Sequence, residues 1–64
     1  MKCLTSPLEA LNLALVGETE TIKLYKKFAR ECSSAKETFL FLAGEEEKHK
    51  RLIQDLIAKL QTHK

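Results

Sequence analysis

The sequence predicts an all-α protein, an antiparallel two-helix hairpin that dimerises into a four-helix bundle. Three observations lead to this prediction. Apolar residues recur at steps of three and four along most of the 64 residues, serine and glutamate pairs mark two helix starts, and only two residues separate the two helical patterns. Nothing alternates with period two over a useful length, so we expect no strand. Residues 1–64 are interpreted as a single helical hairpin domain.

The first helix is expected over about residues 7–32. Ser6 precedes it and Glu9 follows three residues later, a pattern in which a hydroxyl and a carboxylate each cap a free backbone N–H group. Pro7 falls at the first helical position, where its missing N–H group costs nothing. Taken in steps of four and three, the apolar side of this helix consists of Leu8, Leu11, Leu15, Glu18, Ile22, Tyr25, Ala29 and Cys32.

The second helix is expected over about residues 35–62. Ser34 and Glu37 repeat the capping pattern, and the short connection forces the two helices to run antiparallel. Gly17 and Gly44 lie inside the helical patterns, where each costs about 1 kcal/mol relative to alanine, and we expect the two helices to approach closely at these levels. The apolar side of the second helix consists of Ala35, Phe39, Leu42, Glu46, His49, Ile53, Leu56 and Leu60.

Charge and cysteine content narrow the class of protein. The sequence has eleven basic and nine acidic residues and a net charge of +2. Its charge therefore does not favour binding to nucleic acid or to a membrane surface. We expect no signal peptide and no membrane span. Cys3 and Cys32 lack metal-site spacing and are interpreted as reduced thiols of a cytoplasmic protein. They lie about 40 Å apart along one helix, although Cys3 would approach the partner's Cys32 in an antiparallel dimer.

Two acids and one histidine interrupt the apolar stripes. Glu18 precedes the turn by fifteen or sixteen residues, and Glu46 and His49 follow it by twelve and fifteen. At 1.5 Å per residue these positions are roughly 23, 18 and 22 Å above the turn, so the three side chains are expected to converge at one level. Glu45 and Glu47 flank the stripe, and Glu47 is expected to pair with Arg51 in solvent.

Two carboxylates beside an imidazole inside a hairpin require an explanation, because burying them costs several kcal/mol unless a cation compensates. A buried salt bridge is one explanation, but neither stripe contains Lys or Arg. Another explanation is that the three side chains actually lie at the surface, but the neighbouring apolar residues would then be exposed as well. Metal coordination uses all three side chains directly. Glu18, Glu46 and His49 are therefore the candidate metal ligands, although a lone histidine or a lone Glu-x-x-His is common without a metal.

A second apolar stripe on the first helix predicts a homodimer. Two amphipathic helices that pack against each other leave this stripe uncovered. Twofold dimers are the commonest oligomers, and two hairpins make a four-helix bundle. Doubling the three candidate ligands gives four carboxylates and two imidazoles, a formal charge of −4 that two divalent cations would neutralise. The stripe consists of Ala10, Ala14, Thr21, Leu24 and Phe28.

Two stretches resemble the rubrerythrin and ferritin-like di-iron carboxylate proteins. They are GETETIKLYKKFA over residues 17–29, with a tyrosine seven residues after Gly-Glu, and FLFLAGEEEKHKRL over 39–52, with Leu-Ala followed by Glu-x-x-His. The resemblance implies that Glu18, Glu46 and His49 bind two Fe ions per dimer, with Mn or Zn as alternatives. It also places Tyr25 beside the site, where an aromatic core residue is an equally good interpretation.

The half-length layout is similar to the encapsulated ferritin-like proteins, which build the iron site across a dimer interface. Longer rubrerythrins carry four helices in one chain and a rubredoxin domain with CxxC, and this sequence has neither. The sequence stops at QTHK without the C-terminal targeting tail of the encapsulated proteins. The similarity implies a cytoplasmic location inside an encapsulin-type compartment. It also implies that Glu20 holds incoming metal, with a solvated glutamate as the alternative.

We therefore expect a di-iron or di-manganese carboxylate protein that oxidises Fe(II) with O₂ or H₂O₂, as a ferroxidase or a peroxide-reducing oxidoreductase. Glu46 would bridge the metals, and Glu18 and His49 would bind terminally. The expected partners are a second copy, with a larger oligomer as a further option, and dioxygen or peroxide as the small-molecule substrate. A non-catalytic metal-binding dimer and a purely structural helical dimer are the alternatives.

Overall fold

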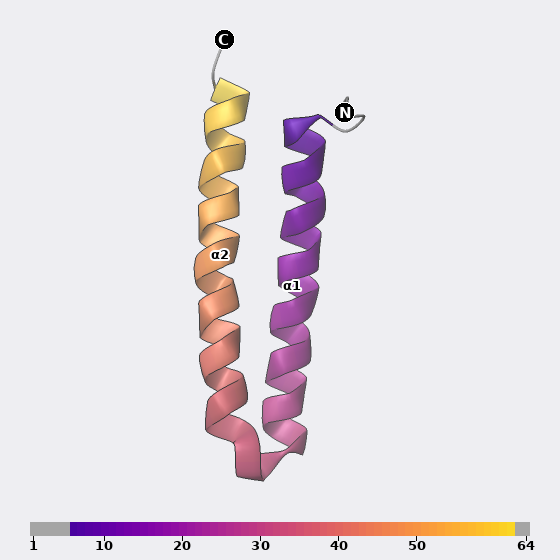
Figure 1. Cartoon of the computed structure of the whole chain (residues 1–64), viewed down its shortest axis with the longest axis vertical. Helices are drawn as coiled ribbons and strands as arrows, with labels where there is room; N and C mark the ends of the chain where they lie inside the picture. The colour runs from indigo at the N-terminus through magenta and orange to yellow at the C-terminus, as the bar shows by residue number, and fades with distance from the viewer. Residues whose placement is uncertain (1–5, 63–64) are drawn as a thin grey trace, which may run out of the picture.

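Two long antiparallel helices lie side by side and are joined by a tight turn (Figure 1). The structure is a computed structural model and describes residues 6–62. Helix α1 spans Pro7–Glu31, the short 3₁₀ helix η1 spans Ser33–Ala35, and α2 spans Lys36–Thr62. No strand occurs in the described residues. The predicted all-α class and both helices are confirmed, with α1 ending one residue earlier and α2 beginning one residue later than expected.

The start of α1 follows the capping pattern of the sequence. The Ser6 hydroxyl accepts a hydrogen bond from the backbone N–H of Glu9 at 3.1 Å. The Glu9 carboxylate accepts one in return from the backbone N–H of Ser6 at 3.4 Å, and Pro7 occupies the first turn. These contacts satisfy N–H groups that have no partner inside the helix, which fixes where α1 begins.

The turn is built differently from the sequence prediction, because Ser34 does not cap α2. Ser34 lies within η1, which leads directly into α2. The backbone carbonyl of Cys32 accepts from the N–H of Ala35 at 2.9 Å, and the carbonyl of Ser33 accepts from the N–H of Lys36. Main-chain oxygens therefore satisfy the N–H groups of Ala35 and Lys36 where the chain enters α2. Cys32 is an exposed free thiol, and Cys3 lies outside the described residues.

The predicted inner stripe of α1 faces α2 from Leu8 to Ala29. On α2 the predicted stripe agrees up to Glu46 and again at Ile53, which is partly covered. The predicted His49, Leu56 and Leu60 are exposed, and Lys50 and Ile57 are partly covered in addition. The prediction stepped along α2 with a mean period of 3.5 residues, and an α-helix of 3.6 residues per turn drifts about 20° from such a stripe in each heptad. Over three heptads the drift rotates the last positions out of the helix pair.

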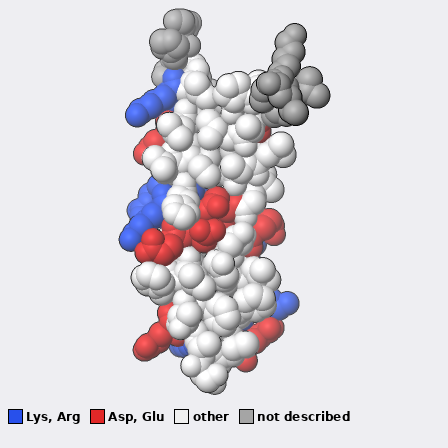
Figure 2. Space-filling view, in the orientation of Figure 1, with Lys and Arg blue, Asp and Glu red and all other residues white. Residues whose placement is uncertain are grey.

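Residues one position before the inner stripe of each helix form a second surface, which we call the open face. Each is turned by about 100° from the stripe in the same rotational sense, and because the helices are antiparallel, both sets come to the same side of the hairpin. Figure 2 shows a side that is largely uncharged, with acidic side chains gathered at mid-height. The open face consists of Ala10, Ala14, Gly17, Thr21 and Leu24 on α1 and of Glu45, His49, Leu52, Leu56 and Leu60 on α2.

The hairpin has almost no core of its own. Only Ile22, Ala29 and Ala43 are buried among residues 6–62. The chain exposes 5264 Å², whereas a compact monomer of the same mass would expose about 4200 Å². The excess of about 1000 Å² is comparable to what one partner buries in a standard protein interface. The radius of gyration, 14.9 Å, also exceeds the value of about 11 Å expected for a compact domain of this length.

No helix within residues 6–62 combines the length and the apolar character needed to cross a membrane. Apolar and charged residues are interspersed at helical spacing along both helices, as expected for helices that are covered on one side only.

Replacing Ser6 by alanine tests the cap of α1. We expect Ser6→Ala to lower the free energy of unfolding by about 1 kcal/mol, because the N–H of Glu9 loses its acceptor. The matched control is Ser34→Ala, which removes a hydroxyl that caps no helix and should change stability by less than about 0.5 kcal/mol. Urea unfolding at a fixed protein concentration measures both. Equal losses in the two variants would contradict the assignment of the caps.

Candidate metal centre

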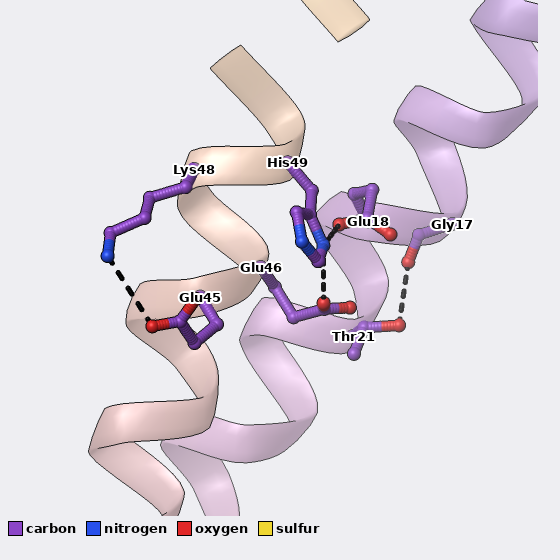
Figure 3. A network of polar contacts seen from close by, with 7 residues as sticks. All are labelled: Gly17, Glu18, Thr21, Glu45, Glu46, Lys48 and His49. Carbon is purple, nitrogen blue, oxygen red and sulfur yellow. Dashed lines mark hydrogen bonds and ion pairs between the residues drawn. The ribbon is translucent and has the colours of Figure 1, made fainter. Parts of the chain in front are cut away.

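Glu18, Glu46 and His49 meet at the middle of the hairpin (Figure 3). Glu18 is carried by α1, and the other two lie one helical turn apart on α2. Each side chain offers a ligand atom, and these atoms all lie within 4.8 Å of one another. The sequence predicted this convergence from the distance of each residue to the turn, and the structure places the three side chains together.

Both carboxylates approach the same ring nitrogen of His49. Its Nδ1 atom lies 3.0 Å from Glu46 Oε1 and 3.7 Å from Glu18 Oε2. The first distance allows a hydrogen bond if Nδ1 carries a proton, and the second is too long for one. Separations of about 3 to 4 Å are those expected between ligand atoms that share one ion at roughly 2.1 Å.

Glu18 supplies the observation that tests whether a cation fits here. Its Oε2 atom is buried and has no hydrogen-bond partner within residues 6–62. A buried acceptor left unpaired costs roughly 1–3 kcal/mol, and more when the group is charged. The Glu18 and Glu46 side chains are only 22% and 21% exposed, so solvent compensates poorly. A metal ion among the three side chains would satisfy this oxygen and offset the repulsion between the two carboxylates.

The surrounding glutamates are paired in a way that the two central ones are not. Lys23 lies 3.7 Å from Glu20, Lys26 lies 3.2 Å from Glu47, and Lys48 lies 3.4 Å from Glu45. Glu18 and Glu46, by contrast, have no ion pair with Lys or Arg in the part of the chain that the structure describes, and His49 is their only ionic neighbour. Positive charge is therefore short at the centre and supplied at its edges.

His49 places the centre on the open face. Its side chain is 59% exposed, although the sequence had put it on the inner stripe. The imidazole leans over the two carboxylates from the uncovered side of α2 (Figure 3). The candidate ligands thus lie partly between the helices and partly at the open face.

The prediction from their spacing that Glu47 pairs with Arg51 is wrong. Glu47 instead accepts a hydrogen bond from Lys26 of α1 at 3.2 Å. This contact joins the two helices on the side opposite the open face, because Glu47 follows Glu46 by one position and is turned by about 100° in the other direction. No local signal identified Lys26 as the partner, since it lies 21 residues away in the sequence.

Two further residues implied by resemblance lie apart from these contacts. Tyr25 stacks against Phe39 with ring centroids 6.3 Å apart, and Phe39 also contacts Phe28. The structure therefore gives Tyr25 an aromatic core contact, and its role beside a metal stays a prediction. Glu20 is exposed and pairs with Lys23, as the solvated alternative anticipated.

The fold and the side chains define a helical hairpin with a carboxylate and histidine cluster suited to a transition metal. A family model described as Rubrerythrin matches residues 9–64, and the chain belongs to this family. The family is ferritin-like and binds iron through carboxylates, which agrees with the donor set at the centre of the hairpin. Searches of curated proteins and of solved structures gave no match.

Replacing Glu18 by glutamine separates the electrostatic strain from metal binding. Without metal, we expect Glu18→Gln to raise the free energy of unfolding by about 1 kcal/mol, because one charge is removed and the new amide can donate to Glu46. The same variant should lose the rise in melting temperature that Mn(II) or Zn(II) gives the wild-type protein.

The matched control is Glu47→Gln, which breaks the pair with Lys26 and should cost less than about 1 kcal/mol. It should retain the response to metal. Melting curves with EDTA and with added metal compare the two variants. An unchanged metal response in Glu18→Gln would refute the assignment of this carboxylate as a ligand.

Proposed function

We propose that two copies of the chain form a four-helix bundle in which Glu18, Glu46 and His49 of both copies together hold two iron ions. We further propose that this dimer oxidises Fe(II) with O₂ or H₂O₂. The observation that carries the proposal is the cluster of these three side chains beside the open face, in which one buried oxygen of Glu18 has no hydrogen-bond partner among residues 6–62. Membership in the rubrerythrin family supports iron as the metal. Manganese is the alternative for the same ligands.

Charge supports a pair of ions shared by two chains. One chain contributes two carboxylates and one imidazole, which is half of the set that di-iron carboxylate bundles use. Two chains related by a twofold axis contribute four carboxylates and two neutral imidazoles, and two divalent cations balance that charge. In this arrangement Glu18, Glu46 and His49 of both chains would hold the two ions.

Burial supports a second copy as the cover of the open face. Leu52, Leu56 and Leu60 are exposed on α2 and Leu24 on α1, and a twofold dimer would remove them from water together with His49. Burying apolar surface contributes roughly 25 cal/mol per Å², so covering several leucines stabilises the pair substantially. Leu13 and Val16 are exposed outside the open face and leave surface for a larger oligomer.

When bound, two Fe(II) ions would supply two electrons, which together with two protons reduce O₂ to H₂O₂ or H₂O₂ to two molecules of water. The chain contributes position and charge to this reaction. Glu18 and Glu46 attract cations and hold them in place, His49 donates a neutral nitrogen, and the leucines of the open face exclude water from the bound ions.

Consumption of oxidant by the iron-loaded protein tests the proposal. We expect added Fe(II) to be oxidised faster with the protein than without it, with matching uptake of O₂ or H₂O₂. Glu46→Gln and His49→Ala should each lower this rate at least tenfold, because each removes a ligand. The control Glu47→Gln, which breaks the exposed pair with Lys26 on the side opposite the open face, should retain the rate.

Iron that binds without accelerated oxidation would leave a metal-binding dimer without catalysis. A protein that holds no iron, and whose melting temperature does not respond to Fe(II), Mn(II) or Zn(II), would favour a structural helical dimer. Iron content and melting temperature, measured on the same samples, distinguish these outcomes from the proposed reaction.

A charge placed on the open face tests the dimer. We expect Leu56→Glu to shift the protein toward monomer, raising the dimer dissociation constant at least tenfold, because a charge would be buried between the two copies. Gln54→Glu adds the same charge two residues earlier on the polar side, beside Glu47, Lys50 and Arg51, and should leave the constant unchanged. Sedimentation equilibrium measures both variants, and equal effects would argue against the open face as the interface.

A further inference from the structure

Gly17 lies inside α1 without a reason that the hairpin itself supplies. Glycine is a much weaker helix former than alanine, and it is expected where the backbone needs positive φ or where a neighbour leaves no room for a side chain. None of the glycines in residues 6–62 has positive φ. A Cβ atom added at Gly17 would meet nothing within 4 Å. Alanine would therefore fit the single chain and strengthen the helix.

Gly44 offers a comparison, because a Cβ atom there would also meet nothing within 4 Å. The two glycines differ in where they face. Gly17 precedes Glu18 by one position and belongs to the open face, at the level of the candidate metal centre (Figure 3). Gly44 follows the buried Ala43 by one position, which turns it by about 100° to the opposite side of the hairpin.

We propose that Gly17 is the point at which the second copy of the chain comes closest to α1, packing directly on its bare backbone. This inference rests on the proposed function, since a metal pair shared across a twofold axis brings both copies close at the level of Glu18. Paired ions in such sites lie about 3.5–4 Å apart, so the two sets of short carboxylate ligands must approach within a few ångströms. A side chain projecting from position 17 would hold the two copies apart.

The neighbours of Gly17 on the open face leave the same space free. Ala14 lies about one turn before it and Thr21 about one turn after it. The Thr21 hydroxyl does not project toward a partner but folds back and donates to the carbonyl of Gly17 at 2.9 Å. The longer leucines of the open face lie farther from this level, beyond Thr21 on α1 and beyond His49 on α2. On its α1 side the open face is thus shallowest beside the candidate ligands.

The test compares Gly17→Ala and Gly17→Leu with Gly44→Ala in the full chain. Sedimentation equilibrium in EDTA gives the dimer dissociation constant of each protein, and metal analysis after Fe(II) loading gives iron per chain. We expect Gly17→Ala to raise the dissociation constant at least tenfold and Gly17→Leu to raise it further. Gly44→Ala should leave the constant within about twofold of wild type while raising the melting temperature by about 4 °C or more. Helix content by circular dichroism verifies that each variant is folded.

The two readouts separate this inference from the function on which it rests. Loss of the dimer in the Gly17 variants alone supports the close contact, and it does so even if the wild-type dimer takes up no iron, in which case only the proposed function fails. Gly17→Ala that behaves like Gly44→Ala, more stable and equally dimeric, overturns the close contact while an iron-loaded wild-type dimer upholds the function. A wild-type chain that is monomeric at every concentration, both in EDTA and after Fe(II) loading, overturns both.

Discussion

Two carboxylates held beside one imidazole set the main constraint on this hairpin. Glu18 of α1 and Glu46 of α2 both approach the Nδ1 atom of His49, and one carboxylate oxygen remains buried without a hydrogen-bond partner among the described residues. Such a contact is unfavourable without a cation and would push the helices apart at this level. Apolar residues on both sides of it, such as Leu15 and Ile22, keep the helices together. A cation that binds only the folded arrangement would stabilise it by mass action.

The second constraint is the small size of the core. The single hairpin buries three apolar residues among those described, so most of its hydrophobic surface has to be covered by another molecule if it is to contribute to stability. The open face and the centre coincide, because His49 lies on the part of α2 that the first helix does not cover. Metal binding and association would therefore reinforce each other, each ordering groups that the other requires.

Residues of one type have different roles here because their surroundings differ. Glu20, Glu45 and Glu47 each have a lysine within 4 Å and form ordinary surface pairs, which contribute little to stability. Glu18 and Glu46 lie at positions that the helical period turns toward the space between the helices. There, the only ionic neighbour of each among the described residues is His49. The run of three glutamates at 45–47 therefore contains one candidate ligand and two solvated side chains, separated by rotation of 100° per residue.

Much of this architecture follows from the sequence alone, because helix period, capping and connection length are local properties. Ser6, Pro7 and Glu9 fixed the start of α1, and the distances to the turn were enough to bring Glu18, Glu46 and His49 to one level. The tertiary structure alone decided the rest. The exposure of His49, Leu56 and Leu60 depends on which side of α2 packs against α1, and the partner of Glu47 is a lysine brought near by the hairpin. The helices meet through η1 and its backbone hydrogen bonds, without a Ser34 cap. The first two features are settled by contacts between segments far apart in the chain, which a local pattern does not encode.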